Sequence, residues 1–159
     1  HNLHILQYLL VYIVSFTTKR IVFYTFVLVR NTKNHVAFYA TLSAHRDLGQ
    51  QQTVEFDIVK TNIGNSYSGV SGVFTVPFDG IYQFSTTMFS LGTDLHAEIM
   101  LNTNAIGQIY GVSNAVSATN NVLISARKGD LVYVRHMENV SRQTIHGLGY
   151  SSFSGFLVE

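Results

Sequence analysis

The chain has 159 residues, the size of one domain, and 47% of them are hydrophobic while only 12% are charged. This composition excludes intrinsic disorder, an acidic tail and a coiled coil. The formal net charge is +1 and cysteine is absent, so disulfides, zinc–thiolate sites and cysteine nucleophiles are also excluded. Residues 33–159 hold seven Lys and Arg against nine Asp and Glu, which leaves no basic stripe for nucleic acid.

The first segment, residues 1–32, differs from the rest of the chain. It contains two apolar runs, 5–16 and 21–29, separated by a polar stretch that includes Lys19 and Arg20. Each run is shorter than the about 20 residues of a transmembrane helix, and joining them would place both cations near the bilayer centre. Four interpretations stay open: a remnant of a signal peptide or signal anchor, a mispredicted extension, an added β-structure and a membrane span. We expect this segment to lie outside the main fold, and the mature protein to have no membrane part.

From residue 33 onward, short apolar runs alternate with turn residues, and no long run shows the apolar stripe of a helix. Residues 36–40 open the first predicted strand, and 54–58 alternate strictly between apolar and acidic side chains. A turn is predicted at 62–65. The next strand, 73–76, ends at Pro77, the only proline, which favours a strand end or edge.

The second half of the chain shows the same pattern. The Asp79-Gly80 pair predicts a tight turn with a glycine at positive φ, and the following residues predict a long strand over 81–89. Further strands are predicted at 97–101, 122–124, 131–134 and 153–158, with turns at 102–104, 127–130 and 147–149. Many short strands at this spacing predict an all-β sandwich or barrel.

Aromatic residues, glycine and asparagine recur at fixed separations through the middle of the chain. These residues are Phe56, Asn62, Tyr67, Phe74, Gly80, Tyr82 and Phe84. In them the chain resembles the globular C1q domain, the head module of complement C1q and its relatives. Thr86 departs from this resemblance, because the family pattern usually closes with another aromatic residue at that place.

Three further segments extend the resemblance. Residues 35–38 look like the first strand of the family, and Gly129 with Asp130 looks like its Gly-Asp hairpin. The C-terminal run 152–157 looks like its Ser-x-Phe-x-Gly-Phe-Leu strand. The resemblance implies that 33–159 is a C1q globular domain, folded as a ten-stranded jelly-roll β-sandwich of the C1q/tumour necrosis factor type.

We interpret these signature residues as mainly structural. The large aromatic ones are predicted to fill the core between two sheets: Phe56, Phe74, Tyr82, Phe84, Phe153 and Phe156. Gly80 and Gly129 are predicted at turns that disfavour a side chain, and Gly155 is predicted where backbone and neighbours approach closely within a strand.

The resemblance implies a secreted, extracellular protein that forms a homotrimer and is not an enzyme. Members of the family bind proteins, carbohydrates, lipopolysaccharide or microbial surfaces, and a rigid trimer adds avidity to weak sites. No Gly-X-Y period occurs, so the chain is similar to the stalkless, lectin-like members that act in innate immunity. Our first hypothesis is pattern recognition of microbial surface carbohydrate or lipopolysaccharide. The alternatives are a secreted signalling ligand for a host receptor and a purely structural trimerisation module.

Neither a cofactor nor a metal site is predicted. Some members of the family bind calcium through acids in the loop before the Gly-Asp hairpin, but this chain has no Asp or Glu between Ile99 and Gly129. Two His-x-Glu pairs, which begin at His96 and His136, lack the cysteines that zinc deaminases require. No nucleophile elbow, zinc-protease motif or phosphate-binding loop is found.

Ligand contacts are predicted in the loops 43–52, 92–97 and 137–149, because loops vary while the sandwich stays fixed. Two arginines and two histidines around the last loop could form a basic patch for an anionic ligand such as lipopolysaccharide or sulfated glycan, or could be solvated loop charges. They are Arg135, His136, Arg142 and His146. The only glycosylation sequon begins at Asn139, in an expected loop.

Overall fold

The computed structural model describes residues 11–17, 20–26, 34–112, 114–138 and 142–158. It divides the chain into two units, His1–Lys33 and Asn34–Glu159. In the first unit, β1 (Val11–Thr17) pairs with β2 (Arg20–Phe26) in an antiparallel hairpin. This pairing corresponds to the added β-structure among the four interpretations, and the origin of 1–32 stays a prediction. No helix in the described ranges is long and apolar enough to cross a membrane.

The described part of the second unit contains twelve strands and no helix. The strands are β3 (Ala37–Thr41), β4 (Arg46–Leu48), β5 (Ile58–Ile63), β6 (Tyr67–Ser68), β7 (Val73–Thr75), β8 (Gly80–Leu91), β9 (Leu95–Leu101), β10 (Asn104–Gly111), β11 (Ala115–Ala126), β12 (Leu131–His136), β13 (Gln143–Ile145) and β14 (Ser152–Leu157). The count exceeds the ten predicted strands because short pairings add elements within the loops. β4 and β13, of three residues each, are examples.

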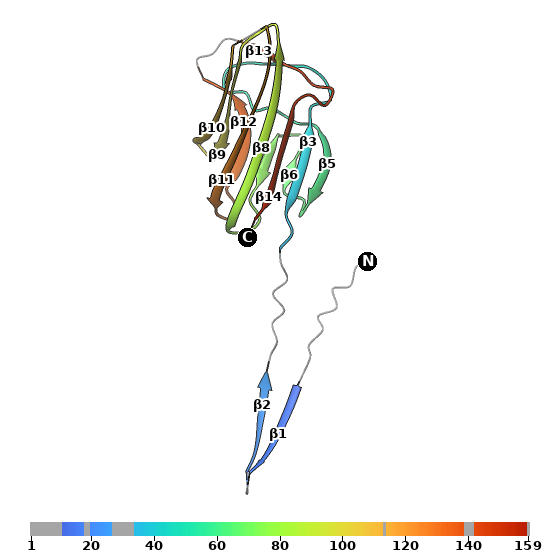
Figure 1. Ribbon diagram of the computed structural model, residues 1–159, viewed down its shortest axis with the longest axis vertical. Coiled ribbons are helices and arrows are strands. Elements are labelled where there is room, and N and C mark those ends of the chain that lie inside the picture. Colours follow the sequence, from blue (N-terminus) through green and yellow to red (C-terminus); the bar gives the residue numbers. More distant parts are fainter. Residues whose placement is uncertain (1–10, 18–19, 27–33, 113, 139–141, 159) are drawn as a thin grey trace. The chain divides into compact units, whose positions relative to one another are not determined.

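These strands form two antiparallel sheets. The five-stranded sheet has the order β10-β9-β12-β7-β6, and the seven-stranded sheet has the order β4-β13-β8-β14-β3-β5, with β11 paired to β8. Figure 1 shows β8 between β11 and β14, with β3 and β5 beyond β14. The predicted all-β sandwich is confirmed.

The core lies between the two sheets and is rich in aromatic rings. β8 buries Tyr82, Phe84, Thr86 and Met88 on one face, as its period-two pattern predicts, while the residues that alternate with them are partly exposed. The ring of Phe38 lies 4.5 Å from that of Tyr67 and 5.0 Å from that of Phe153, measured between centroids. Because these partners come from both sheets, their burial holds the layers together.

The prediction that Phe156 fills the core is wrong, because its side chain is 44% exposed. Its neighbour Gly155 faces the core instead. A Cβ added at Gly155 would lie 2.4 Å from Cδ1 of Phe84, so only glycine fits there without a shift. Since successive side chains of a strand point to opposite faces, Phe156 must point outward.

The predictions for the two turn glycines, Gly129 and Gly80, have different outcomes. Gly129 has a φ of 93°, which confirms its predicted turn conformation. Gly80 is already the first residue of β8, opposite Ala126, so its placement in the turn is wrong by one residue. The bend before the strand lies at Phe78 and Asp79.

Candidate functional site

Of the three loops that were predicted to contact a ligand, the last, 137–149, lies against each of the other two. Their contacts join β4, β13 and the segment after β8, although these elements are far apart in sequence. The rings of His45 and His146 have centroids 4.2 Å apart, and the backbone N–H of Gly147 donates to Nδ1 of His45 over 3.1 Å. Ligand contact by these loops stays a prediction.

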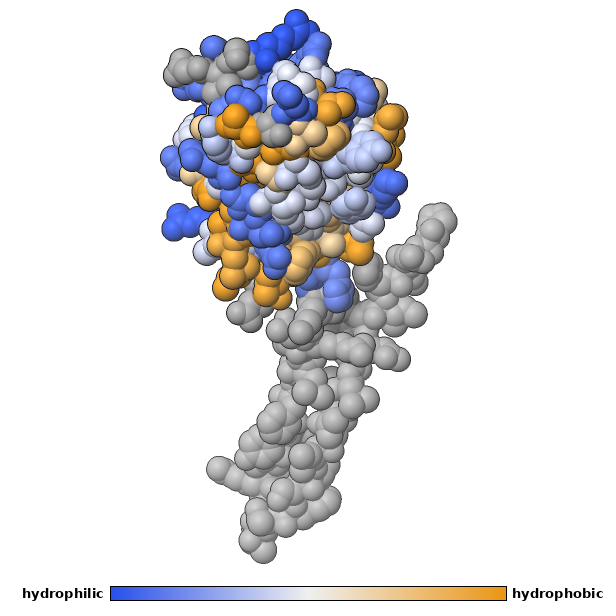
Figure 2. Space-filling view, turned by 45° about the horizontal axis from the view of Figure 1, so that its top comes forward, coloured by the Kyte–Doolittle hydropathy of each residue, from blue (hydrophilic) through white to orange (hydrophobic). Residues whose placement is uncertain are grey.

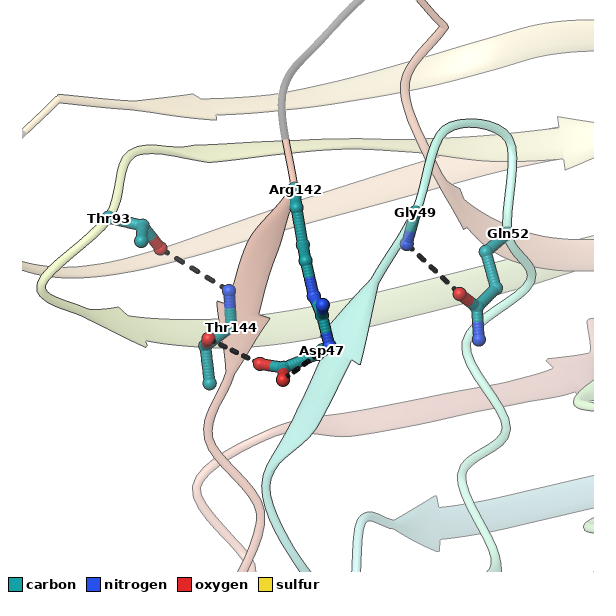
Figure 3. A network of polar contacts seen from close by, with 6 residues as sticks. All are labelled: Asp47, Gly49, Gln52, Thr93, Arg142 and Thr144. Carbon is teal, nitrogen blue, oxygen red and sulfur yellow. Dashed lines mark hydrogen bonds and ion pairs between the residues drawn. The ribbon is translucent and has the colours of Figure 1, made fainter.

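Asp47 is the centre of the polar network between two of these loops (Figure 3). Its carboxylate accepts hydrogen bonds from Nη2 of Arg142 at 2.7 Å and from Oγ1 of Thr144 at 2.6 Å. The Thr144 hydrogen bond and the Arg142 charge lower the pKa of Asp47. The backbone N–H of Thr144 donates to Oγ1 of Thr93 over 3.4 Å. The network therefore connects β4 and β13 to the loop 92–97.

Gln143 provides a second tie from a buried position. Its side chain is joined to His96 twice: the backbone N–H of His96 donates to Oε1 at 2.8 Å, and Nε2 donates to the His96 carbonyl at 3.0 Å. An amide that satisfies one donor and one acceptor of the same residue fixes that residue as a neighbouring strand would. The loop 92–97 is therefore fastened to β13.

The four residues of the predicted basic patch have separate surroundings. Arg135 lies on β12 and its Nε donates to Oε1 of Glu98 at 2.8 Å, while Arg142 pairs with Asp47. His136 is fully buried, with its Nδ1 2.9 Å from the carbonyl oxygen of Gly49. Both arginine charges are thus compensated by carboxylates, and His136 has no exposed surface with which to reach a ligand.

His146 and Asn139 are the remaining predicted site residues around the last loop. His146 is partly exposed and packs against Phe89 at a ring distance of 5.3 Å. Ligand contact by Arg135, Arg142 and His146 stays a prediction. Asn139 lies outside the described residues, so its glycosylation also stays a prediction. Among the described residues, no cluster of His, Asp and Glu could hold a metal ion.

Two polar signature residues, Asn62 and Asp130, stabilise local backbone structure through hydrogen bonds of their side chains. The amide of Asn62 donates to the carbonyl of Tyr67 at 2.9 Å and accepts from its N–H at 3.2 Å, which closes the link between β5 and β6. Asp130 accepts from the N–H of Arg127 at 2.8 Å and from the amide of Asn102 at 3.0 Å. These hydrogen bonds lower the pKa of Asp130 and fix the turn before β12. Both residues therefore have a structural role.

A groove that was not predicted from the sequence lies beside the edge strand β6. Its volume is about 620 Å³, and twelve residues from β6, β7 and three turns line it. They are Gly64, Asn65, Ser66, Tyr67, Ser68, Ser71, Val73, Thr75, Val76, Pro77, Lys128 and Gly129. The run of Ser, Gly and Asn from 64 to 72 was the available signal, but Lys128 arrives from a distant part of the chain.

Comparisons with solved structures place this fold among known ones. The globular domain of zebrafish complement 1qA protein matches with a TM-score of 0.63 and 18% identity, over 78% of this chain and 98% of that one. Eiger TNF from S. frugiperda matches with a TM-score of 0.58 and 14% identity, over 79% of this chain and 92% of that one. These likenesses show the C1q and tumour necrosis factor type of sandwich.

Sequence comparisons give the family. Zebrafish (Danio rerio) Caprin-2 is 32% identical over 80% of this chain, and human complement C1q tumor necrosis factor-related protein 3 is 28% identical over 77%. The chain spans 14% of the first relative and 51% of the second. Domains of the C1q/tumour necrosis factor family bind and signal without catalysis, typically form trimers, and occur in homologues that are usually secreted. The sequence model of the C1q domain family matches residues 37–158, and the chain therefore belongs to the C1q domain family.

Proposed function

We propose that this chain is a secreted, homotrimeric recognition protein that binds carbohydrate or lipopolysaccharide on microbial surfaces. The observation that carries the assembly is one uncharged sheet face. Four strands that lie side by side, β11, β8, β14 and β3, contain no Asp, Glu, Lys or Arg. Depletion of charge distinguishes the core of a protein interface from ordinary surface.

The register shows which side chains make up this uncharged face. Leu123 lies opposite Gln83, and Gln83 lies opposite Phe156; Leu123 is 65% exposed. In the next row, Ser85 lies between Asn121 and Ser154. In the space-filling view, residues of intermediate hydropathy lie near the centre of the visible face of the sandwich unit, with hydrophilic residues at its top and hydrophobic residues toward its lower end (Figure 2). Another copy that packs here would cover Leu123 and Phe156 without removing any charge from water.

The oligomeric state tests the proposed assembly. We expect light scattering of the full chain at micromolar concentration to give a mass near three times the 17.8 kDa protomer. Leu123→Lys should shift the mass to one protomer, because it places a buried ammonium at each contact. Val70→Lys, at a side chain that is 88% exposed and away from these strands, is the matched control and should keep the trimer. A monomeric wild-type chain would disprove the assembly.

The ligand class is tested separately. Labelled full chain should bind bacterial cells or lipopolysaccharide-coated surfaces, and soluble saccharide should compete. The alternative function, a secreted signalling ligand for a host receptor, predicts saturable binding to host cells and no microbial binding. The family's binding and signalling character is compatible with both, and the microbial ligand is preferred because the groove beside β6 is lined by hydroxyl and amide groups.

A further inference from the structure

We propose that the groove beside β6 binds a sugar unit that carries a carboxylate or a phosphate. This inference rests on the proposed function, because it names the site through which a microbial glycan would be held. Six polar residues line the groove, and the described residues of its lining include no Asp or Glu. They are Asn65, Ser66, Ser68, Ser71, Thr75 and Lys128. Hydroxyls and an amide both donate and accept, as the hydroxyl groups of a sugar require.

Several of these groups are available for a ligand. Asn65, Ser71, Thr75 and Lys128 are exposed, and no described residue makes a hydrogen bond or ion pair with their side chains. The hydroxyl of Ser68 accepts from the N–H of Ser71 at 3.3 Å, and so keeps its own hydrogen to donate. The hydroxyl of Ser66 already donates to the carbonyl of Gly64 at 3.1 Å, so it can offer a ligand only an acceptor.

The walls of the groove are fixed by tight turns. Gly64 and Asn65 have φ values of 87° and 50°, and Gly129, which also lines the groove, has 93°. Gly72 has a φ of 72°, and a Cβ there would lie 2.4 Å from the carbonyl oxygen of Val54. A preformed site loses little conformational entropy when it binds, which makes weak polar contacts effective.

The lining also has an apolar part. Tyr67 and Val76 are buried, and Pro77 and Val73 are half-buried beside them. Pockets for small ligands combine such a surface with a few placed polar groups. Here the apolar part suits the C–H face of a sugar ring, and the hydroxyls around it suit the ring's edge.

Lys128 selects for an anion. It is the one charged side chain among the described lining residues, and its ammonium can pair with a carboxylate or phosphate. The carboxylate of Asp79 accepts the backbone N–H of Lys128 at 2.7 Å. In the same turn, the carboxylate of Asp130 accepts hydrogen bonds from the backbone N–H of Arg127 and the side-chain amide of Asn102.

The test uses ¹⁵N-labelled full chain titrated with glucuronic acid, glucose 6-phosphate and glucose. We expect the amide signals of 64–71 and 128–129 to shift with one or both anionic sugars, and that comparison separates carboxylate from phosphate. Lys128→Gln should weaken this binding at least tenfold. Lys60→Gln, an exposed lysine on β5 that does not line the groove, should leave it unchanged.

Three outcomes would overturn the inference: no shifts in the groove, equal binding of glucose, or equal binding by Lys128→Gln. Failure of the proposed function looks different. If the chain binds sugar in this groove but does not bind microbial surfaces, the site stands and the microbial function falls. If it binds microbial surfaces and Lys128→Gln binds them equally, the function stands and this site falls.

Discussion

Phe84 lies among the packed rings of the aromatic core. Its ring lies 5.3 Å from that of Phe74 and 6.1 Å from those of Tyr82 and Phe153, and the side chain is fully buried. Truncation therefore removes contacts with both sheets and leaves a cavity. Phe84→Ala should lower the free energy of unfolding by about 3–5 kcal/mol.

Chemical denaturation of the full chain measures this loss. Val70→Ala is the control, because its exposed side chain has little to lose and its effect should stay within about 0.5 kcal/mol. A cost below about 1 kcal/mol for Phe84→Ala would contradict its assignment to the centre of the core.

Asp57 gives the fold a dependence on pH. Burial acts to raise its pKa, but hydrogen bonds from the Ser43 hydroxyl and N–H, together with the Arg46 charge, lower it on balance. The Ser43 N–H donates to Oδ1 of Asp57 at 2.9 Å, and the Arg46 guanidinium lies 3.6 Å from Oδ2. A carboxylate whose pKa is lower in the folded chain stabilises it above the unfolded value near 3.8, and this contribution is lost as the pH falls through the folded value.

Stability should therefore fall as the pH drops below about 4. We expect Asp57→Asn to reduce stability at pH 7 and to flatten part of this decline, and Ser43→Ala to flatten it less, because the backbone N–H remains. Ser71→Ala removes a hydroxyl with no carboxylate partner and is the control. Urea unfolding at several pH values is the measurement. A decline that is equally steep in wild type and Asp57→Asn would exclude this role.

At the scale of the element, β14 is shaped by one glycine. Gly155 pairs with Phe84 on one side and Phe38 on the other, and an added Cβ would meet both rings, at 2.4 Å and 2.9 Å. The missing side chain lets two core rings fill the space above the strand. Close packing, rather than a left-handed backbone, requires glycine here.

Gly155→Val should destabilise the domain by about 1–3 kcal/mol through overpacking. Replacing Phe84 by Leu in the same chain should recover part of that loss, because the smaller side chain makes room. Ser154→Ala, one residue away on the outer face of β14, is the control for a change in the same strand. Thermal unfolding compares the variants, and an unchanged midpoint in Gly155→Val would contradict the packing role.

At the scale of the whole molecule, the two sheets differ in their content of charged residues. The five-stranded sheet carries charged residues such as Glu98 and Arg135, whereas four adjacent strands of the other sheet carry none. A trimer built on the uncharged side would present three copies of the groove beside β6 as one rigid unit. Three weak sites held in this way can exceed the affinity of one site by about 10².

Local pattern was sufficient to predict the fold class and most of the core. Strict alternation through β8 placed Tyr82 and Phe84 on a buried face, and the structure has them fully buried. The strand predicted over 54–58 is wrong in its bounds, because β5 begins only at Ile58; Phe56 is buried as predicted, but Ile58 is 43% exposed. The Arg127–Asp130 turn was predicted as well, because Gly129 favours a positive φ. These features depend on residues close in sequence, whose preferences act before any long-range contact forms.

Phe156 shows where pattern alone was insufficient. A large aromatic residue in a signature strand was predicted to be buried, but Gly155 takes the core position beside it. The choice depends on the rings of Phe84 and Phe38, which arrive from other strands. Period two predicts that neighbours face opposite ways, and the packing decides which of them faces inward.

The candidate site was the part least determined by sequence. The sequence by itself specified the β-sandwich, its signature residues and the loops in which charge gathers, because periodicity and turn chemistry are local. Only the tertiary structure decided that Arg142 pairs with Asp47, 95 residues away, and that Lys128 joins the serines of the groove beside β6. Charge compensation and the lining of a groove depend on which distant side chains the fold brings within a few ångströms.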